Sequence, residues 1–261
     1  MRPPFRLGTS GYSFDDWRGR FYPPGTGGAG MLPFYAREFD IVEINSTYYR
    51  IMAPSSSAGM VERTPDGFGF AVKLHSGMTH AMDAGEADWK AFSEMLVPFR
   101  EAGRLECLLA QFPFAFKCTD ESLARVGEIV GRCAPAPLAV EFRHDSWYAG
   151  GLAGIEAAAS LGAAPVSVDL PALPGLPPRV PVGGAPFGYV RFHGRNTRDW
   201  WGGGTLRYDY GYSGEELRSW LPGLSDLAGR AGKVFIFFNN CHGAQAVDSA
   251  RMMRSLLEGG A

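Results

Sequence analysis

The chain has 261 residues, of which 46% are hydrophobic and 20% charged, and its formal net charge is −2. This composition is that of an ordinary globular protein, and the balanced charge excludes a global attraction to nucleic acid or to an acidic membrane surface. No run approaches the ~20 apolar residues of a membrane span, and residues 1–10 lack the apolar core of a signal peptide. We therefore expect a cytoplasmic protein without membrane contact, in which any anion site is local.

The four cysteines, Cys107, Cys118, Cys133 and Cys241, are widely spaced and form no C-x-x-C pair. This spacing is more typical of reduced thiols than of a zinc or iron–sulfur site. We expect no metal to be bound by cysteine.

Eight short apolar runs, each ending on polar residues, predict eight strands. In chain order they are Arg6–Ser10, Asp40–Ser46, Phe68–His75, Leu105–Phe112, Leu138–His144, Pro165–Leu170, Phe187–His193 and Lys233–Asn240. Most of the intervening segments have the spacing and end signals of amphipathic helices. The predicted helices are Met31–Phe39, Ser55–Arg63, Asp88–Ala102, Thr119–Cys133, Gly151–Leu161, Ser213–Ala228 and Ala244–Glu258.

Alternating strands and helices predict a parallel sheet, and eight such units in about 250 residues predict a (β/α)8 TIM barrel. We expect residues 1–261 to form this single domain. The sixth βα connection is expected to be degenerate, because Pro171–Pro186 holds six prolines and three glycines where a helix would lie. An open doubly wound sheet is the alternative. It is disfavoured because no G-x-G-x-x-G follows the first strand and no phosphate-binding P-loop motif occurs.

The fifth predicted strand, Leu-Ala-Val-Glu-Phe-Arg-His, ends in three charged or titratable residues. Side chains alternate between the two faces of a strand, so Glu141 and Arg143 share one face and Val140 and Phe142 the other. His144 has the opposite parity to Glu141, and we expect it to cap the following loop. If only this strand is considered, an ion pair that holds two strands together would be enough to explain its charged residues.

The same alternation, with the β-branched face packed outward on the helices, places polar residues of seven strands around the carboxyl-terminal mouth of the barrel. These residues are Glu43, Asn45, Lys73, His75, Gln111, Glu141, Arg143, Asp169, Arg191, His193 and Asn239. Barrel interiors are usually filled by Val, Ile and Leu, and burying each unpaired ion costs several kcal/mol. A ring of this kind therefore predicts a functional pocket.

The sequence also resembles the YecE-like family, known as domain of unknown function 72. The resemblance runs from about Leu7 to Met252 and includes, in order, G-T-S-G-Y-S (8–13), F-Y-P-P (21–24), V-E-I-N-S-T-Y-Y-R (42–50), T-P-D-G-F-G-F-A-V-K (64–73), L-L-A-Q-F-P (108–113), A-V-E-F-R-H-D-S-W (139–147), Y-V-R-F-H-G-R (189–195) and F-N-N (238–240). The resemblance implies a TIM barrel and supplies no reaction, because the family has no established activity. The C-H-G-A after Asn240 is less typical of the family.

Two loops beside the mouth suggest ligand contacts. The loop Gly194–Gly204 combines Arg195 and Arg198 with Trp200 and Trp201, a stacking surface flanked by cations that suits a base or sugar ring bearing phosphate. Packing of these tryptophans over the barrel edge is the structural alternative. Further aromatic residues, Tyr12, Trp17 and Trp147, are expected to extend the same wall.

A second anion site is expected after the eighth strand, where Asn239, Asn240 and Gly243 lead into a helix. Free N–H groups and the helix dipole commonly hold phosphate at this place in a barrel.

The first functional hypothesis is a hydrolase or lyase acting on a phosphate-bearing substrate, nucleic acid included. Glu141 or His193 would act as general acid or base, with Glu43 and Asp169 as further catalytic carboxylates. Substrate-binding side chains would be Lys73, Arg143, Arg191, Asn45, Gln111, Asn239, Asn240, Tyr12, Trp200 and Trp201. No cofactor is required. A divalent metal on Glu43, Glu141, Asp169 and His193 is an alternative, which the nearby cations argue against.

Three other hypotheses stay open. The charges of the mouth could only orient a ligand in a non-enzymatic binding barrel. Glu43 and Glu141 could form the carboxylate pair of a glycosidase-like enzyme, although a retaining separation of about 5–5.5 Å is not expected for strands that lie across the barrel. Finally, Lys73 could form a Schiff base, because cationic neighbours would lower its pKa.

Overall fold

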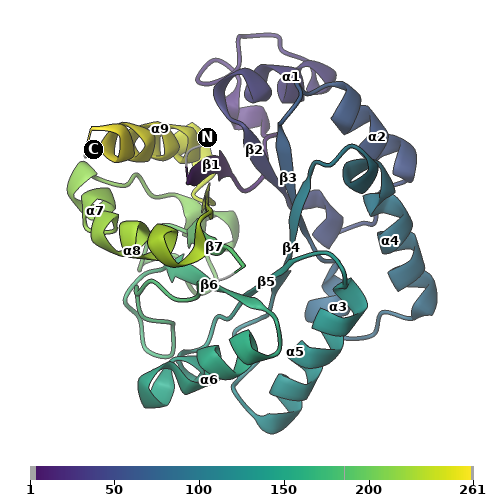
Figure 1. The fold of residues 1–261 in the computed structure, drawn as a ribbon. Coiled ribbons are helices and arrows are strands. Elements are labelled where there is room, and N and C mark those ends of the chain that lie inside the picture. The colour runs from purple at the N-terminus through teal and green to yellow at the C-terminus, as the bar shows by residue number, and fades with distance from the viewer. Residues whose placement is uncertain (1–3, 185, 260–261) are drawn as a thin grey trace.

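The computed structural model describes residues 4–184 and 186–259. Eight parallel strands form a nearly closed barrel with helices on its outside (Figure 1), which confirms the predicted (β/α)8 fold. The strands are β1 (Phe5–Thr9), β2 (Ile41–Ile44), β3 (Gly69–Lys73), β4 (Leu105–Gln111), β5 (Leu138–Glu141), β6 (Ala164–Asp169), β7 (Gly188–Phe192) and β8 (Val234–Phe238). The helices are α1 (Gly28–Glu38), α2 (Pro54–Glu62), α3 (Ser76–Thr79), α4 (Glu86–Glu101), α5 (Asp120–Cys133), α6 (Ala149–Ser160), α7 (Gly214–Arg218), α8 (Leu221–Ala231) and α9 (Gln245–Glu258).

The strands end earlier than the apolar runs of the sequence suggested. β2 ends at Ile44, before Asn45, and β7 ends at Phe192, before His193. The polar residues predicted for the mouth therefore lie at one of the last two positions of a strand or just beyond its end. Six of these side chains, those of Asn45, Lys73, Gln111, Arg143, Arg191 and Asn239, reach the space above the barrel.

Two features of the helices follow from local sequence. Ser213 caps α7 as predicted, because its hydroxyl accepts from the Glu216 N–H and the Glu216 carboxylate accepts from the Ser213 N–H. The predicted helix Ser213–Ala228 is wrong in being continuous: it breaks into α7 and α8 between Arg218 and Leu221. Pro222 explains the break, since its ring would clash with the carbonyl of Arg218 in an unbroken helix.

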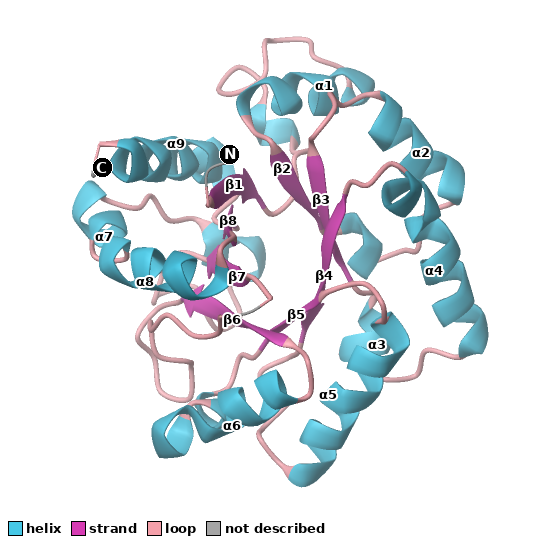
Figure 2. Ribbon diagram, in the orientation of Figure 1, coloured by secondary structure: helices cyan, strands magenta, loops and turns pink. Residues whose placement is uncertain are grey.

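The sixth connection is irregular, as predicted, and the described residues between β6 and β7 contain no helix (Figure 2). The short helix α3 after β3 was not predicted.

The barrel is closed at β1 and β2 by a side chain as well as by backbone. Only one bridge, between Ser10 and Glu43, joins the two strands in the described parts of the chain. Below it, the hydroxyl of Tyr35 from α1 accepts from the Thr9 N–H at 2.8 Å and donates to the Ile41 carbonyl at 3.2 Å. A Cβ on Gly8 would lie 2.3 Å from the Ile41 carbonyl oxygen, so only glycine allows this approach. Tyr35 thus replaces ladder hydrogen bonds at the seam.

Apolar side chains fill two layers. The larger cluster packs the outward faces of the strands against the helices. The smaller cluster fills the barrel and contains Ile41, Ala71, Cys107, Leu109, Ala139, Ala164, Val166, Val168, Leu170, Leu176, Phe187, Tyr189, Trp200, Phe235 and Phe237. The polar residues of the mouth therefore lie above a closely packed apolar barrel interior. No helix within residues 4–184 and 186–259 is long and apolar enough to cross a membrane.

Candidate functional site

A cavity of about 710 Å³ lies over the carboxyl ends of the strands. Nine of the predicted substrate-binding residues line it: Tyr12, Asn45, Lys73, Gln111, Arg143, Arg191, Trp200, Trp201 and Asn239. The volume is in the range of small-molecule sites, about 300–1,000 Å³. The prediction of a polar pocket at this end of the barrel agrees with this geometry.

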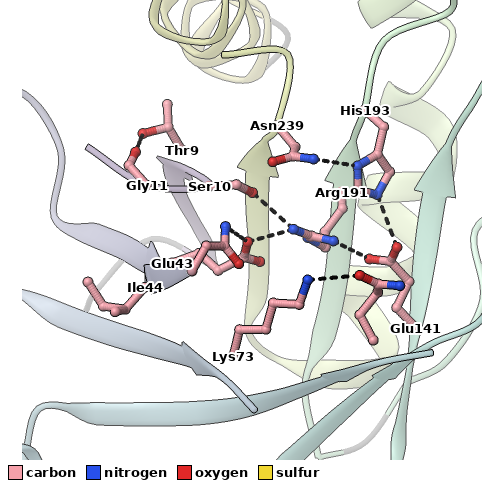
Figure 3. A network of polar contacts seen from close by, with 12 residues as sticks. Thr9, Ser10, Gly11, Glu43, Ile44, Lys73, Glu141, Arg191, His193 and Asn239 are labelled. Atoms are coloured by element: carbon pink, nitrogen blue, oxygen red, sulfur yellow. Dashed lines mark hydrogen bonds and ion pairs between the residues drawn. The ribbon is translucent and has the colours of Figure 1, made fainter. Parts of the chain in front are cut away.

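Glu43 is fully buried behind the lining of the cavity, and both of its carboxylate oxygens are hydrogen-bonded (Figure 3). Its Oε1 accepts from Arg191 Nη2 at 2.7 Å and from Asn45 Nδ2 at 2.8 Å, and its Oε2 accepts from the Tyr189 hydroxyl. Burial by itself raises the pKa of the Glu43 carboxyl, but the Arg191 charge and these hydrogen bonds outweigh burial and lower it. Glu43 is therefore an ionised anchor for Arg191.

Glu141 is equally buried and binds two arginines (Figure 3). Its Oε2 accepts from Arg191 Nη1 at 2.6 Å, and its Oε1 accepts from Arg143 Nε. Burial raises the pKa of Glu141, but Arg143, Arg191 and His193 outweigh it and hold the pKa well below the ordinary value. An acid that stays ionised at neutral pH is a poor proton donor.

His193 is fully buried. Asn239 Nδ2 lies 2.9 Å from its Nδ1, Glu141 Oε1 lies 3.2 Å from its Nε2, and Arg143 Nη2 lies within 3.5 Å of both ring nitrogens. Burial and the adjacent Arg143 lower the pKa of His193 to about 3. His193 is thus a neutral imidazole beside Glu141 at pH 7.

Lys73 is a cavity cation without a carboxylate partner. Its Nζ donates to Gln111 Oε1 at 2.8 Å and lies 4.3 Å from the centre of the Tyr48 ring, and no Asp or Glu of the described residues comes within 4.0 Å of it. Burial and the charges of Arg191 and Arg143 lower the pKa of Lys73 to about 7, although Glu141 acts in the opposite direction. Its amine is therefore about half neutral at physiological pH.

Asp169 does not reach the cavity, which corrects its prediction as a catalytic or metal-binding carboxylate. Val166 and Val168 of β6 point into the barrel, and Asp169 faces outward. There it accepts from Arg195, from the Tyr212 hydroxyl at 2.8 Å and from Trp220 Nε1 at 2.7 Å. The valines of β6 therefore face into the barrel, opposite to the orientation expected from the sequence. The outer face of β6 contacts polar groups of Arg195, Tyr212 and Trp220 instead of an apolar helix face.

With Asp169 outside, the donor set predicted for a divalent metal is not brought together. Within the described ranges, no group of three or more His, Cys, Asp or Glu side chains is arranged to hold a metal ion.

The phosphate site predicted before the last helix is also corrected. Asn240 is buried and donates to the Tyr210 carbonyl at 2.8 Å and to Ser249 Oγ at 3.1 Å, so its side chain braces a loop. The Gly243 N–H donates to the Asp16 carboxylate at 2.7 Å. A carboxylate of the protein already occupies the place where an anion was expected.

The four tryptophans predicted to form the aromatic wall differ in whether they line the cavity. Trp200 is buried over the inner core, whereas Trp201 is 53% exposed and packs edge-on against Phe114. Trp17 and Trp147 are fully buried behind the cavity wall, and neither contributes to the lining.

The other polar residues of the mouth serve local structure. Arg195 is held by Asp169 and Glu216, so it is not a free cation. His144 caps its loop as predicted, accepting from the Ser146 N–H at 3.1 Å. His75, expected at the mouth, instead accepts from the Gly77 N–H and caps α3.

The lining residues that sequence reasoning missed include Tyr48, Tyr49, His80, Arg207 and Tyr208. Tyr48 and Tyr49 lie four and five residues after the end of β2, so their place in the loop after a barrel strand was a usable signal. His80 follows the unpredicted α3, and Arg207 and Tyr208 lie in the 3₁₀ turn Gly204–Tyr208. Those positions depend on how long loops fold back, which periodicity does not report.

Comparison with known proteins identifies a family. The model of the "Protein of unknown function DUF72" family matches residues 6–261. The chain is 31% identical to the UPF0759 protein YunF of Bacillus subtilis, over 97% of this chain and 94% of that protein.

Two solved structures are similar to this chain over nearly its whole length. The first is a DUF72 family protein from Thermotoga maritima (TM-score 0.88, 37% identity, 97% of this chain and 99% of that one). The second is a DUF72 family protein from Enterococcus faecalis (TM-score 0.86, 28% identity, 97% and 95%). Together with the barrel, the family match means that this chain belongs to the DUF72 family of proteins of unknown function.

Proposed function

We propose that the protein is an enzyme, a lyase or a hydrolase, that binds a phosphate-bearing substrate at the mouth of the barrel. The observation that carries the proposal is the charge of the cavity lining. Lys73, Arg143, Arg191 and Arg207 line the cavity, and no Asp or Glu of residues 4–184 and 186–259 does so. An anion that enters meets only cationic and neutral groups.

The charges behind the wall do not cancel this excess. Arg191 and Arg143 neutralise Glu43 and Glu141, to which they are paired. Arg207 and the protonated fraction of Lys73 remain in excess, and within the described chain neither forms an ion pair with a carboxylate. Arginine presents several N–H donors that match phosphate oxygens.

The walls favour a ligand that also contains a ring. Tyr48, Tyr49, Phe114, Trp200 and Trp201 border the cavity, and three of them, Tyr49, Phe114 and Trp201, are exposed at its rim. Aromatic faces stack on bases and sugar rings at about 1–3 kcal/mol per stacked base. A nucleotide, a segment of nucleic acid or a sugar phosphate has both features.

For the reaction itself, Lys73 is better suited than the carboxylates to exchange a proton near neutral pH. Glu141 stays ionised and His193 stays neutral, and both are buried behind the arginines. The glycosidase alternative is weakened by the same facts, because one carboxyl of the pair would have to be protonated.

A non-enzymatic binding barrel remains the second candidate. One observation favours it: each buried carboxylate of the mouth is already paired. Turnover of any bound ligand would separate the two candidates.

The test is a thermal-shift screen with inorganic phosphate, sugar phosphates, nucleotides and their unphosphorylated counterparts. Phosphorylated ligands should raise the melting temperature, since a ligand at about 100 times its Kd stabilises the folded state by ~2.7 kcal/mol. Arg207→Ala should weaken binding about tenfold, the effect of losing a charge-assisted hydrogen bond of ~1.5 kcal/mol.

Arg198→Ala is the matched control, because Arg198 is an exposed arginine nearby that does not line the cavity. The proposal is wrong if no phosphorylated ligand shifts the melting temperature, or if the two arginine variants lose affinity equally.

A further inference from the structure

Lysine is rare in this chain, and one lysine is placed unlike the rest. Only four of the 25 basic residues are lysines: Lys73, Lys90, Lys117 and Lys233. Lys90, Lys117 and Lys233 are on the surface, and the side chains of Lys90 and Lys233 are 77% and 49% exposed. The ion pairs that build the mouth use arginine, which does not lose its proton in proteins. The one mouth cation that can become a neutral nucleophile is Lys73.

The surroundings of Lys73 fix its amine at the cavity wall. Gln111 accepts from Nζ, and Gln111 is itself oriented by the hydrogen bond from its Nε2 to the Phe112 carbonyl at 2.6 Å. The ring of Tyr48 packs against the amine from another side. Figure 3 shows Lys73 reaching from β3 toward the Arg191 network, with no carboxylate bonded to Nζ. An amine held by one amide oxygen and one ring keeps its lone pair available when it is deprotonated.

We propose that Lys73 is a covalent nucleophile, whose amine forms a Schiff base with the carbonyl carbon of a phosphate-bearing aldehyde or ketone. This inference rests on the proposed function, since Arg207 and Arg143 would hold the phosphate while Lys73 attacks the carbonyl. It also specifies that function as carbonyl chemistry of the lyase type.

The step balances without an oxidant or a second substrate. Lys73 first gives up one proton, and the nitrogen lone pair then forms a bond to the carbonyl carbon as the C=O π electrons move to oxygen. A proton moves from the nitrogen to that oxygen, which gives a carbinolamine with one N–H. The C–O bond then breaks, and the oxygen leaves as water with the proton that Lys73 first gave up. The protonated imine therefore keeps one N–H and the positive charge of the original ammonium.

The test uses pyridoxal 5′-phosphate as a probe, because it combines an aldehyde, a phosphate and an aromatic ring. Wild-type protein is incubated with a substoichiometric amount at pH 7, reduced with borohydride and digested, and the label on each of the four lysines is measured by mass spectrometry. We expect Lys73 to carry at least about tenfold more label than any other lysine, since an exposed amine of pKa ~10.4 is almost entirely protonated at this pH. Lys73→Arg should lose this label, and Lys90→Arg should keep it.

Two further ligands separate the inference from the function on which it rests. Pyridoxine 5′-phosphate lacks the aldehyde, so it tests binding alone and should suppress the labelling of Lys73. Pyridoxal lacks the phosphate, and Arg207→Ala should reduce labelling by the phosphorylated probe but not by pyridoxal. If pyridoxine 5′-phosphate binds while the four lysines are labelled equally, Lys73 is not the nucleophile and the proposed function stands. If it does not bind and labelling is equal, both are overturned.

A folding defect of Lys73→Arg would not obscure the result, because the distribution of label in wild type is independent of any variant. In wild type the labelling rate should also rise with a midpoint near pH 7. A rate that rises only near pH 10 would overturn the inference.

Discussion

At the scale of single residues, the buried ions of the mouth are organised around Arg191. Its Nη1 and Nη2 bind Glu141 and Glu43, two of the three carboxylates predicted to be catalytic. Each carboxylate is then satisfied by a second donor, Arg143 or Tyr189. Breaking a buried pair of this kind typically costs 3–5 kcal/mol, because it leaves an unpaired buried charge. The sequence left two roles open for Glu141, general acid or base and partner of an arginine. Its contacts are those of a residue that holds arginines in place.

The neutral state of His193 makes stability depend on pH in a definite direction. Its pKa is lowered from 6.5 to about 3 by burial and Arg143, so the unfolded chain takes up a proton first as the pH falls. The stabilising contribution is complete above pH 6.5 and is lost progressively between about pH 6.5 and 3. We expect the free energy of unfolding to fall by about 2 kcal/mol from this residue between pH 7.5 and pH 5.

Urea unfolding at a series of pH values measures this loss. His193→Gln, which keeps a side-chain N–H for Glu141, should have a shallower pH dependence in this range. His80 contributes in the same direction, since burial and Lys73 lower its pKa to about 4, so part of the slope should remain in the variant. Identical slopes for wild type and variant would mean that His193 is not held neutral.

At the scale of elements, the seam between β1 and β2 depends on one hydroxyl from α1. Tyr35→Phe keeps the packing of the ring but leaves the buried Thr9 N–H without its acceptor. An unsatisfied buried donor costs about 1–3 kcal/mol. We expect the variant to lose this much unfolding free energy in urea titrations.

Tyr49→Phe is the control for this prediction, since Tyr49 is 80% exposed and its substitution should change stability by less than about 0.5 kcal/mol. Equal stabilities of Tyr35→Phe and wild type would show that backbone pairing alone closes the barrel.

The elements were largely predictable because the signals for them are local. Eight apolar runs correspond to eight strands, and the Ser213 capping box marks the start of α7. The continuous helix predicted through Pro222 was wrong because its amphipathic spacing was given more weight than the proline. α3 was missed because a helix of four residues has no periodicity to detect.

At the scale of the whole molecule, Trp200 connects the candidate site to the core. It is 2% exposed and belongs to the inner cluster that fills the barrel, and it also lines the cavity above. Trp200→Ala should therefore cost about 3–5 kcal/mol, the usual effect of emptying a large buried aromatic site. Trp201→Ala, at a half-exposed position, should leave stability within about 0.5 kcal/mol.

Chemical denaturation of the two variants measures these changes, and ligand titration should show a loss of affinity for ring-bearing phosphates in Trp201→Ala. A Trp200 variant as stable as wild type would mean that the tryptophan only covers the core and does not fill it.

The sequence by itself determined the barrel and the inward face of most strands. Two-residue periodicity is a property of each strand alone, so it correctly brought Lys73 and Arg191 to the cavity lining and Glu43 and Glu141 to the buried network behind it. It failed at β6, where Asp169 faces outward, because the inner face there is apolar and its outer neighbours are polar residues far along the chain.

Only the tertiary structure decided which of these charges remain available. Asp16 binds the Gly243 N–H in the turn before α9, although the two residues are more than 200 positions apart in the sequence. Asn240 donates to the Tyr210 carbonyl, which belongs to a different βα connection. The same folding pairs both buried carboxylates with arginines and leaves Lys73 beside an amide and a ring. The ion pairing and the desolvation of a side chain depend on its neighbours in space. They determine whether the side chain is charged and available, which the residue type alone does not determine.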